Sequence, residues 1–215
     1  MKKDAKPIYT LQDYDGVFGS VPLLGEGRIL EVDARFSTAA LEAAALGRLW
    51  TAGDATYGAP VVDMLHHIEH HLDILGEACV ADAARCAIQL SVFRERAMAF
   101  LADYGDGQVM SRYVALPKGD GRLPFADHAF DSVWVRDWAL NFSPARFMEW
   151  CRVGLDVRLY PILDETGNVA DVLGPVLADL QAQNLGMEIM MVAHPKTQVP
   201  NALLRVWSKA CVLSG

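Results

Sequence analysis

Apolar residues in this chain form short runs that alternate with longer stretches of helical spacing. The short runs, rich in β-branched residues and leucine, predict strands at residues 27–32, 48–54, 109–116, 130–135, 155–163, 187–192 and 203–206. The longer stretches predict helices at residues 38–47, 61–75, 82–104, 144–151 and 169–183. Alternating strands and helices are typical of a mainly parallel sheet with helices on both faces.

Three local patterns refine this prediction. Residues 61–75 carry one apolar stripe, which would cover either this chain's own sheet or a second copy in a homodimer. The helix at 82–104 is expected to end at Gly105-Asp106-Gly107, since glycine disfavours a helix interior. The last two strands are separated only by a loop, so we expect them to pair antiparallel.

The size and composition of the chain favour one folded unit. Its 215 residues, 52% hydrophobic and 21% charged, suit a single α/β domain over residues 1–215. No apolar run approaches the ~18 residues of a membrane span, and no signal-peptide core follows the basic first residues. The four cysteines are scattered without a CxxC pair, which is typical of buried thiols in a reducing compartment. We therefore expect a cytoplasmic protein.

The charge of the chain bears on its partners. The formal net charge is −8, and lysine and arginine form no cluster along the sequence. Proteins that bind nucleic acids normally carry a basic patch that neutralises phosphates. A small molecule or another protein is therefore the expected partner, and a nucleic acid is not.

Three motifs occur in an order that resembles a known superfamily. They are the Arg-Tyr-Val of residues 112–114, the LPFADHAFDSVWVR of residues 123–136 and the DVRLYPILDETG of residues 156–167. Together they resemble class I S-adenosylmethionine-dependent methyltransferases over essentially the whole chain. Within this superfamily, the three motifs are most similar to those of a bacterial group. The resemblance implies an α/β Rossmann-like methyltransferase fold, with a mostly parallel sheet, an antiparallel C-terminal strand and helices on both faces.

The first motif of that superfamily is altered in this chain. Methyltransferases of this class follow strand one with an acidic residue and a glycine-rich loop, which here aligns with the EVDARFS of residues 31–37. Glycine lets the backbone approach a ligand closely and adopt positive φ. In this chain Glu31 keeps the acidic position, but Asp33 and Arg35 replace glycines. Their side chains would occupy the space of the cofactor's methionine and ribose, and Arg35 would place a cation beside its sulfonium.

The resemblance also assigns the remaining cofactor positions. Asp54, at the end of the second strand, matches the acidic residue that bonds the ribose hydroxyls, although a strand-end turn residue is an equal reading of it. A retained cofactor pocket would be framed by Glu31, Asp33, Asp54, Leu116, Trp134 and Asp137. The sequence identifies no catalytic residue, because many methyl transfers need only positioning of the acceptor.

Two functions follow from this resemblance. A degenerate cofactor loop favours a pseudoenzyme that has become a binding or regulatory protein. The alternative is an active S-adenosylmethionine-dependent methyltransferase that acts on a small molecule or a protein.

A histidine cluster suggests a third function. Residues 66–71 read HHIEHH, so His66 and His70 lie four residues apart on one helix face, as metal ligands often do. Asp63 and Asp73 extend the set, and this face lies opposite the apolar stripe, toward solvent. A solvated polar surface explains the pattern, and so does a metal-binding protein or a site for an adventitious divalent metal.

Overall fold

The computed structural model contains one seven-stranded sheet, and it describes residues 8–19, 27–78, 83–136, 138, 143–163, 167–169, 171, 173–192 and 201–208. The strands are β1 (Ile29–Val32), β2 (Trp50–Asp54), β3 (Tyr113–Ala115), β4 (Phe130–Arg136), β5 (Gly154–Tyr160), β6 (Leu185–Val192) and β7 (Asn201–Ser208). Their order is β3-β2-β1-β4-β5-β7-β6. The first five strands are parallel, and β7 pairs antiparallel with β5 and β6. The predicted sheet and its antiparallel end are confirmed.

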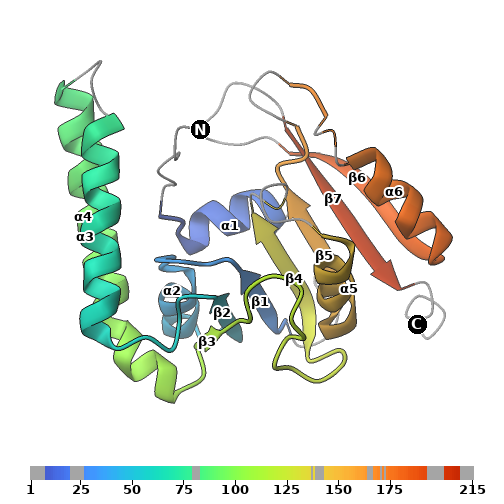
Figure 1. Cartoon of the computed structure of the whole chain (residues 1–215), viewed down its shortest axis with the longest axis horizontal. Coiled ribbons are helices and arrows are strands. Elements are labelled where there is room, and N and C mark those ends of the chain that lie inside the picture. The colour runs from blue at the N-terminus through green and yellow to red at the C-terminus, as the bar shows by residue number, and fades with distance from the viewer. Residues whose placement is uncertain are drawn as a thin grey trace.

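Helices cover both faces of this sheet (Figure 1). They are α1 (Leu11–Phe18), α2 (Ala39–Ala45), α3 (Val61–Ala78), α4 (Ala83–Val109), α5 (Pro144–Val153) and α6 (Leu173–Ala182). Side chains of α1, α2, α3 and α4 pack in one core cluster with Ile29 and Trp134. Side chains of α5 and α6 pack in a second cluster with Leu30 and Val133. Because successive strand residues point to opposite faces, β1 and β4 contribute to both clusters.

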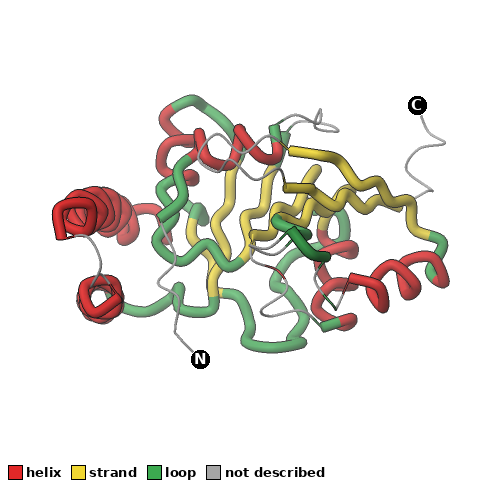
Figure 2. The backbone as a smooth tube through the Cα atoms, turned by 90° about the horizontal axis from the view of Figure 1, so that it is seen from above, coloured by secondary structure: helices red, strands yellow, loops and turns green. Residues whose placement is uncertain are grey.

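The helices α3 and α4 form a long pair beside the β3 end of the sheet (Figures 1 and 2). The buried residues of α3 at this contact are Met64 and Ile68, and those of α4 include Phe93 and Phe100. The apolar stripe predicted for residues 61–75 therefore packs against α4 and the first core cluster.

The predicted end of the helix at residues 82–104 is wrong. α4 continues through Gly105 and Gly107 to Val109, and β3 begins only at Tyr113. A Cβ atom added at Gly107 would lie 2.3 Å from the Tyr113 ring. This glycine therefore serves a close contact between α4 and β3 and does not break the helix.

The cysteine prediction is corrected at one position. Cys86 is disulfide-bonded in the structure, so the expectation of a free thiol there is wrong. Cys151 is a free thiol, and burial raises its pKa to about 12.

Within the described residues, no helix has both the length and the apolar composition that crossing a bilayer would require.

The short helix α1 was not expected from the sequence pattern. Thr10 caps it, since its Oγ1 accepts a hydrogen bond from the Asp13 amide (3.2 Å) while the Asp13 carboxylate accepts one from the Thr10 amide (3.1 Å). Such a reciprocal cap stabilises the first helical turn. Phe18, at the end of the helix, is fully buried and stacks on Trp134 with 5.0 Å between ring centroids. α1 is therefore part of the core.

A buried ionic network joins β5 to the neighbouring strands. The Asp156 carboxylate accepts hydrogen bonds from Arg158 Nε (3.2 Å) and Nη2 (3.0 Å), from Arg205 Nε (3.0 Å) and from the Ser132 hydroxyl. The side chains of Asp156 and Arg158 have no exposed surface. Arg158 Nη1 also donates to the carbonyl oxygen of Phe18 (2.7 Å), which connects this network to α1.

Candidate functional site

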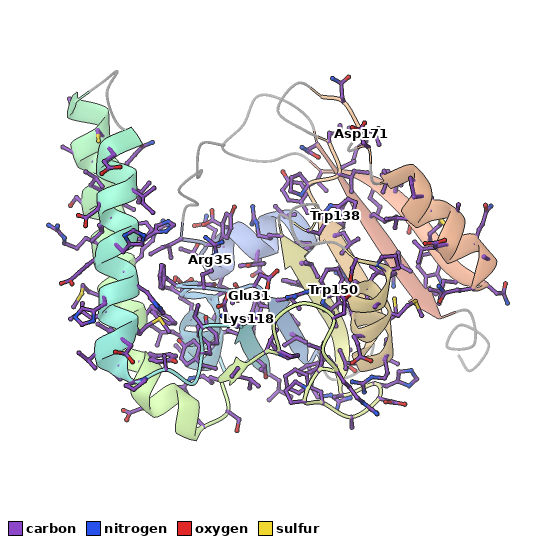
Figure 3. The ribbon with its side chains drawn as sticks, in the orientation of Figure 1. Glu31, Arg35, Lys118, Trp138, Trp150 and Asp171 are labelled. Carbon is purple, nitrogen blue, oxygen red and sulfur yellow. The ribbon has the colours of Figure 1, made fainter. Side chains whose placement is uncertain are left out.

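The candidate site begins with the loop that follows β1. Residues 33–37, called the β1 loop below, lead from the carboxyl end of β1 toward α2. Asp33 (φ 56°) and Arg35 (φ 49°) both adopt the left-handed region, which is unfavourable for residues with a Cβ atom. The backbone therefore keeps the positive φ that suits glycine, although neither residue is glycine. Figure 3 labels Glu31, which belongs to β1, and Arg35, which belongs to the loop that follows it.

The Asp54 carboxylate is occupied by hydrogen bonds from its own chain. Its Oδ2 accepts from the Arg35 amide (3.0 Å), and its Oδ1 accepts from the Thr56 amide (2.8 Å) and hydroxyl (2.7 Å). The residue is only 5% exposed. In this structure Asp54 therefore fixes the β1 loop against the end of β2.

Asp33 is bound by an arginine of α5, a helix on the other face of the sheet. Its Oδ1 accepts a hydrogen bond from Arg146 Nη2 (2.9 Å), and the same guanidinium donates through Nη1 to the Gly119 carbonyl (3.2 Å). Arg146 lies in the first turn of α5 and is 8% exposed. The ion pair therefore links the β1 loop to α5.

Glu31 is fully buried beneath the β1 loop. Its Oε2 accepts a hydrogen bond from Trp50 Nε1 (2.9 Å), whereas Oε1 has no partner of good hydrogen-bond geometry. Burial raises the pKa of this carboxyl to about 7, although the hydroxyls of Tyr14 and Ser37 oppose the shift. Near neutral pH the carboxyl is therefore only partly ionised.

Replacing Glu31 with glutamine is expected to change how stability depends on pH. Above pH 4.5 the unfolded chain releases the Glu31 proton, but the folded state keeps it until about pH 7, so the native state loses stability across this interval. Between pH 5 and pH 8 this loss amounts to roughly 2–3 kcal/mol, at about 1.4 kcal/mol per pKa unit.

Urea unfolding of both proteins at pH 5 and pH 8 measures this effect. The free energy of unfolding of the glutamine variant, relative to that of the unmodified protein, should be roughly 2–3 kcal/mol higher at pH 8 than at pH 5. The exposed Glu188→Gln variant serves as the control, and its effect should be the same at both pH values. A pH-independent effect of Glu31→Gln would contradict the prediction.

Leu116 and Trp134 both belong to the core. Leu116 is 4% exposed, and its side chain fills the space where a Cβ atom of Gly53 would lie, 2.8 Å from its Cδ1. Trp134 is 1% exposed, and its Nε1 donates to the Ser132 hydroxyl (2.8 Å). Asp137, the remaining residue of the expected frame, lies outside the described residues.

The histidines of α3 separate into two groups. His66 and His70 are exposed, as are Asp63 and Asp73, so the predicted solvent-facing side is confirmed. Among the residues with described side chains, no three histidine, cysteine or acidic groups are close enough to hold a metal ion. His71 turns the other way and stacks on Phe93 with 5.1 Å between ring centroids.

A surface hollow lies beside the β1 loop and is called the β1-loop hollow. It has an empty volume of about 380 Å³, including the part open to solvent. Its walls are Ile8, Tyr9, Tyr14, the β1 loop, His71 and Arg136. The sequence had pointed to the β1 loop, but not to the contribution of residues 8–14. The Thr10 capping signal was the one available indication that this segment is ordered.

The Arg136 side chain forms the base of this hollow. Its guanidinium lies 3.7 Å from the centre of the Tyr9 ring and donates from Nη1 to the Asp13 carbonyl (3.3 Å). Residues 8–14 form the wall opposite the β1 loop and are called the roof of the hollow. Hydrogen bonds from the Thr38 amide (3.0 Å) and the Ser37 hydroxyl (3.2 Å) to the Tyr9 carbonyl attach this roof to the β1 loop and the start of α2. The hollow therefore combines an arginine with aromatic walls.

Comparison with solved structures identifies the fold. The chain is similar to the glycopeptide N-methyltransferase MtfA in complex with S-adenosyl-L-methionine, with a TM-score of 0.51, 12% identity and coverage of 93% of this chain and 87% of that one. It is also similar to the methyltransferase domain of bacterial CtHen1 (TM-score 0.47, 8% identity, coverage 84% and 90%). A third similar structure is an S-adenosylmethionine-dependent methyltransferase from Aquifex aeolicus (TM-score 0.43, 10% identity, coverage 91% of each chain).

Sequence comparisons add no relative to these structures. No protein-family model matches the sequence, and no curated protein sequence matches it significantly. The strand order and the similarity to MtfA nevertheless agree over nearly the whole chain. This protein has the class I methyltransferase fold, an α/β Rossmann-like fold with a seven-stranded mixed sheet.

Proposed function

We propose that this chain is a methyltransferase-fold protein with a degenerate cofactor loop, which serves as a binding or regulatory protein and not as a methyltransferase. The observation that carries the proposal is the occupied carboxylate of Asp54. At the position that the resemblance assigns to the ribose hydroxyls, both oxygens already accept hydrogen bonds from Arg35 and Thr56. Three of the roughly four acceptor positions of this buried carboxylate are therefore used, which leaves about one for the two ribose hydroxyls, and any donor that a nucleoside displaced would lose a hydrogen bond.

The side chains of the β1 loop support the same proposal. Asp33 is bound in an ion pair with Arg146, which adds a side chain where close approach of bare backbone would be needed. The Arg35 guanidinium adds a cation to the loop near which the resemblance puts the sulfonium of the cofactor, and like charges repel. Both features disfavour S-adenosylmethionine.

The active-methyltransferase alternative also has one observation in its favour. The positive φ values of Asp33 and Arg35 keep the loop backbone in a conformation suited to glycine. A cofactor that pushed both side chains aside would still meet this backbone.

Titration with S-adenosylmethionine and its demethylated product distinguishes the two functions. We expect neither compound to raise the temperature of unfolding, even at millimolar concentration. A ligand present at 100 times its dissociation constant would add about 2.7 kcal/mol. For a chain of this size that gain corresponds to roughly 5–10 °C. A saturable shift of this size in the unmodified protein would contradict the proposal and favour the active enzyme.

A double variant, Asp33→Gly with Arg35→Gly, provides the matched comparison. Glycine tolerates positive φ and removes both side chains, so this variant is expected to respond to the cofactor more strongly than the unmodified protein. The double variant leaves the net charge unchanged, and the exposed Arg94→Gln variant controls for the loss of an arginine elsewhere. If the double variant is also unresponsive, the closed Asp54 site is sufficient to prevent binding.

A further inference from the structure

The β1-loop hollow contains a buried cation that forms no ion pair with the described residues. Arg136 is 8% exposed, and its Nε is buried without a hydrogen-bond partner. Among the described residues, no carboxylate lies within ion-pair distance of its guanidinium, whose contacts are the Asp13 carbonyl and the faces of tyrosine rings such as Tyr9. A buried charge is costly unless a counter-charge or hydrogen bonds compensate it. An anion bound in the hollow would therefore compensate the charge of this arginine.

A second cation lies at the mouth of the same hollow. The Arg35 side chain is exposed, and within the described part of the chain its guanidinium has no ion pair. The one carboxylate among the lining residues belongs to Asp33, and Arg146 neutralises it at 2.9 Å. Glu31, whose carboxyl interacts electrostatically with Arg136, is buried and only partly ionised near neutral pH, so it offsets this charge only in part. The hollow is therefore locally positive.

This local charge is opposite to that of the protein as a whole. The chain has a formal net charge of −8. A cleft lined by one sign of charge, with walls of low dielectric constant, concentrates ligands of the opposite sign. Small anions would therefore bind in this positive hollow in preference to the rest of the negatively charged surface.

The walls of the hollow indicate the shape of such an anion. Tyr9, Tyr14, Phe36 and Ile8 present rings and one aliphatic side chain to the space beside the two arginines. Ligand pockets commonly combine apolar walls with a few polar groups that fix orientation. The empty volume of about 380 Å³ includes open solvent, so a bound ligand would lie partly outside the enclosed space.

We propose that the β1-loop hollow binds a small organic anion, a carboxylate carried on an aromatic or apolar body. The carboxylate would interact with the guanidinium groups of Arg35 and Arg136, since the planar guanidinium matches the geometry of a carboxylate. The body would pack against Tyr9 and Phe36. This inference rests on the proposed function, because a bound S-adenosylmethionine would occupy the same end of the sheet.

Three probes test the charge and the body of the ligand separately. Benzoate carries both, benzamide has nearly the same shape without the charge, and inorganic phosphate has the charge without the body. In calorimetric titration we expect benzoate to bind at least tenfold more tightly than benzamide and than phosphate. Equal affinities for benzoate and benzamide would overturn the anion site, and phosphate binding as tight as benzoate would overturn the apolar body. Absence of benzoate binding would overturn the whole inference.

Arginine variants test where the anion binds. Arg35→Gln is expected to weaken benzoate binding about tenfold, and Arg136→Gln by more, because the buried arginine acts at lower dielectric. Arg94→Gln removes an exposed arginine of α4 that does not line the hollow, and it should leave the affinity unchanged. Arg35 is exposed, so its variant decides the test even if Arg136→Gln fails to fold. Equal affinities of the Arg35 and Arg94 variants would overturn the assignment.

The cofactor titration separates this inference from the proposed function. Benzoate binding without a response to S-adenosylmethionine supports both. No response to either compound overturns the anion site and leaves the loss of cofactor binding in place. Saturable binding of both overturns the proposed function, and the anion site then stands only if Arg35→Gln weakens benzoate.

Discussion

Replacing Asp156 with asparagine is expected to lower the free energy of unfolding by about 3–5 kcal/mol, since removing one partner of a buried ion pair leaves the other charge uncompensated. Asparagine keeps the shape of the side chain, so the variant removes mainly the charge. Arg158, which has no exposed surface, would lose its ion pair with Asp156, and Arg205 would lose the same partner. Urea unfolding monitored by circular dichroism measures the change.

The same substitution at an exposed aspartate provides the control. Asp127 is 67% exposed and forms an ion pair with Arg152 at 2.8 Å. Exposed pairs typically contribute less than about 1 kcal/mol, so Asp127→Asn should have only a small effect. If the two variants lost equal stability, the Asp156 network would not be the buried electrostatic centre described above.

The Phe18→Ala variant is expected to lose about 3–5 kcal/mol of stability, the usual cost of removing a buried phenylalanine ring. Phe18 has no exposed surface and stacks on both Trp134 (5.0 Å) and Tyr14 (5.7 Å). The variant would leave a cavity between α1 and the sheet, and it would loosen the helix whose last carbonyl bonds Arg158.

Thermal and urea unfolding of this variant should be compared with Leu46→Ala. Leu46 is 67% exposed at the end of α2, and substitutions at such positions usually change stability by less than about 0.5 kcal/mol. If Phe18→Ala were as mild as this control, α1 would be a peripheral helix and not part of the core.

The sheet was predictable because strand and helix patterns are local. Each buried strand has its own apolar run, and the alternation with helices implies parallel pairing. The prediction failed where a distant contact determines the role of a residue. Gly107 has the local signature of a helix end, but the ring of Tyr113 requires a glycine within the helix. The sequence alone does not show that contact.

The candidate site was predictable only in part, for the same reason. Its position after β1 follows from the motif order, and the altered residues Asp33 and Arg35 are visible in the sequence. The bond from the Arg35 amide to Asp54 depends on the register of β1 with β2, whereas the bonds from Thr56 are local to the turn after β2. The approach of Tyr9 to Arg136 joins residues more than a hundred positions apart. No local pattern encodes either of these long-range contacts.

The roof of the hollow is also anchored to the long helix pair. Arg96 of α4 donates from Nη1 to the carbonyl oxygen of Ile8 (2.9 Å), and its guanidinium lies 3.8 Å from the Asp13 carboxylate. Moving residues 8–13 away from the β1 loop would therefore require breaking a bond to α4. A displacement of α4 would therefore be transmitted through Ile8 to Tyr9 and to the Arg136 guanidinium beneath its ring.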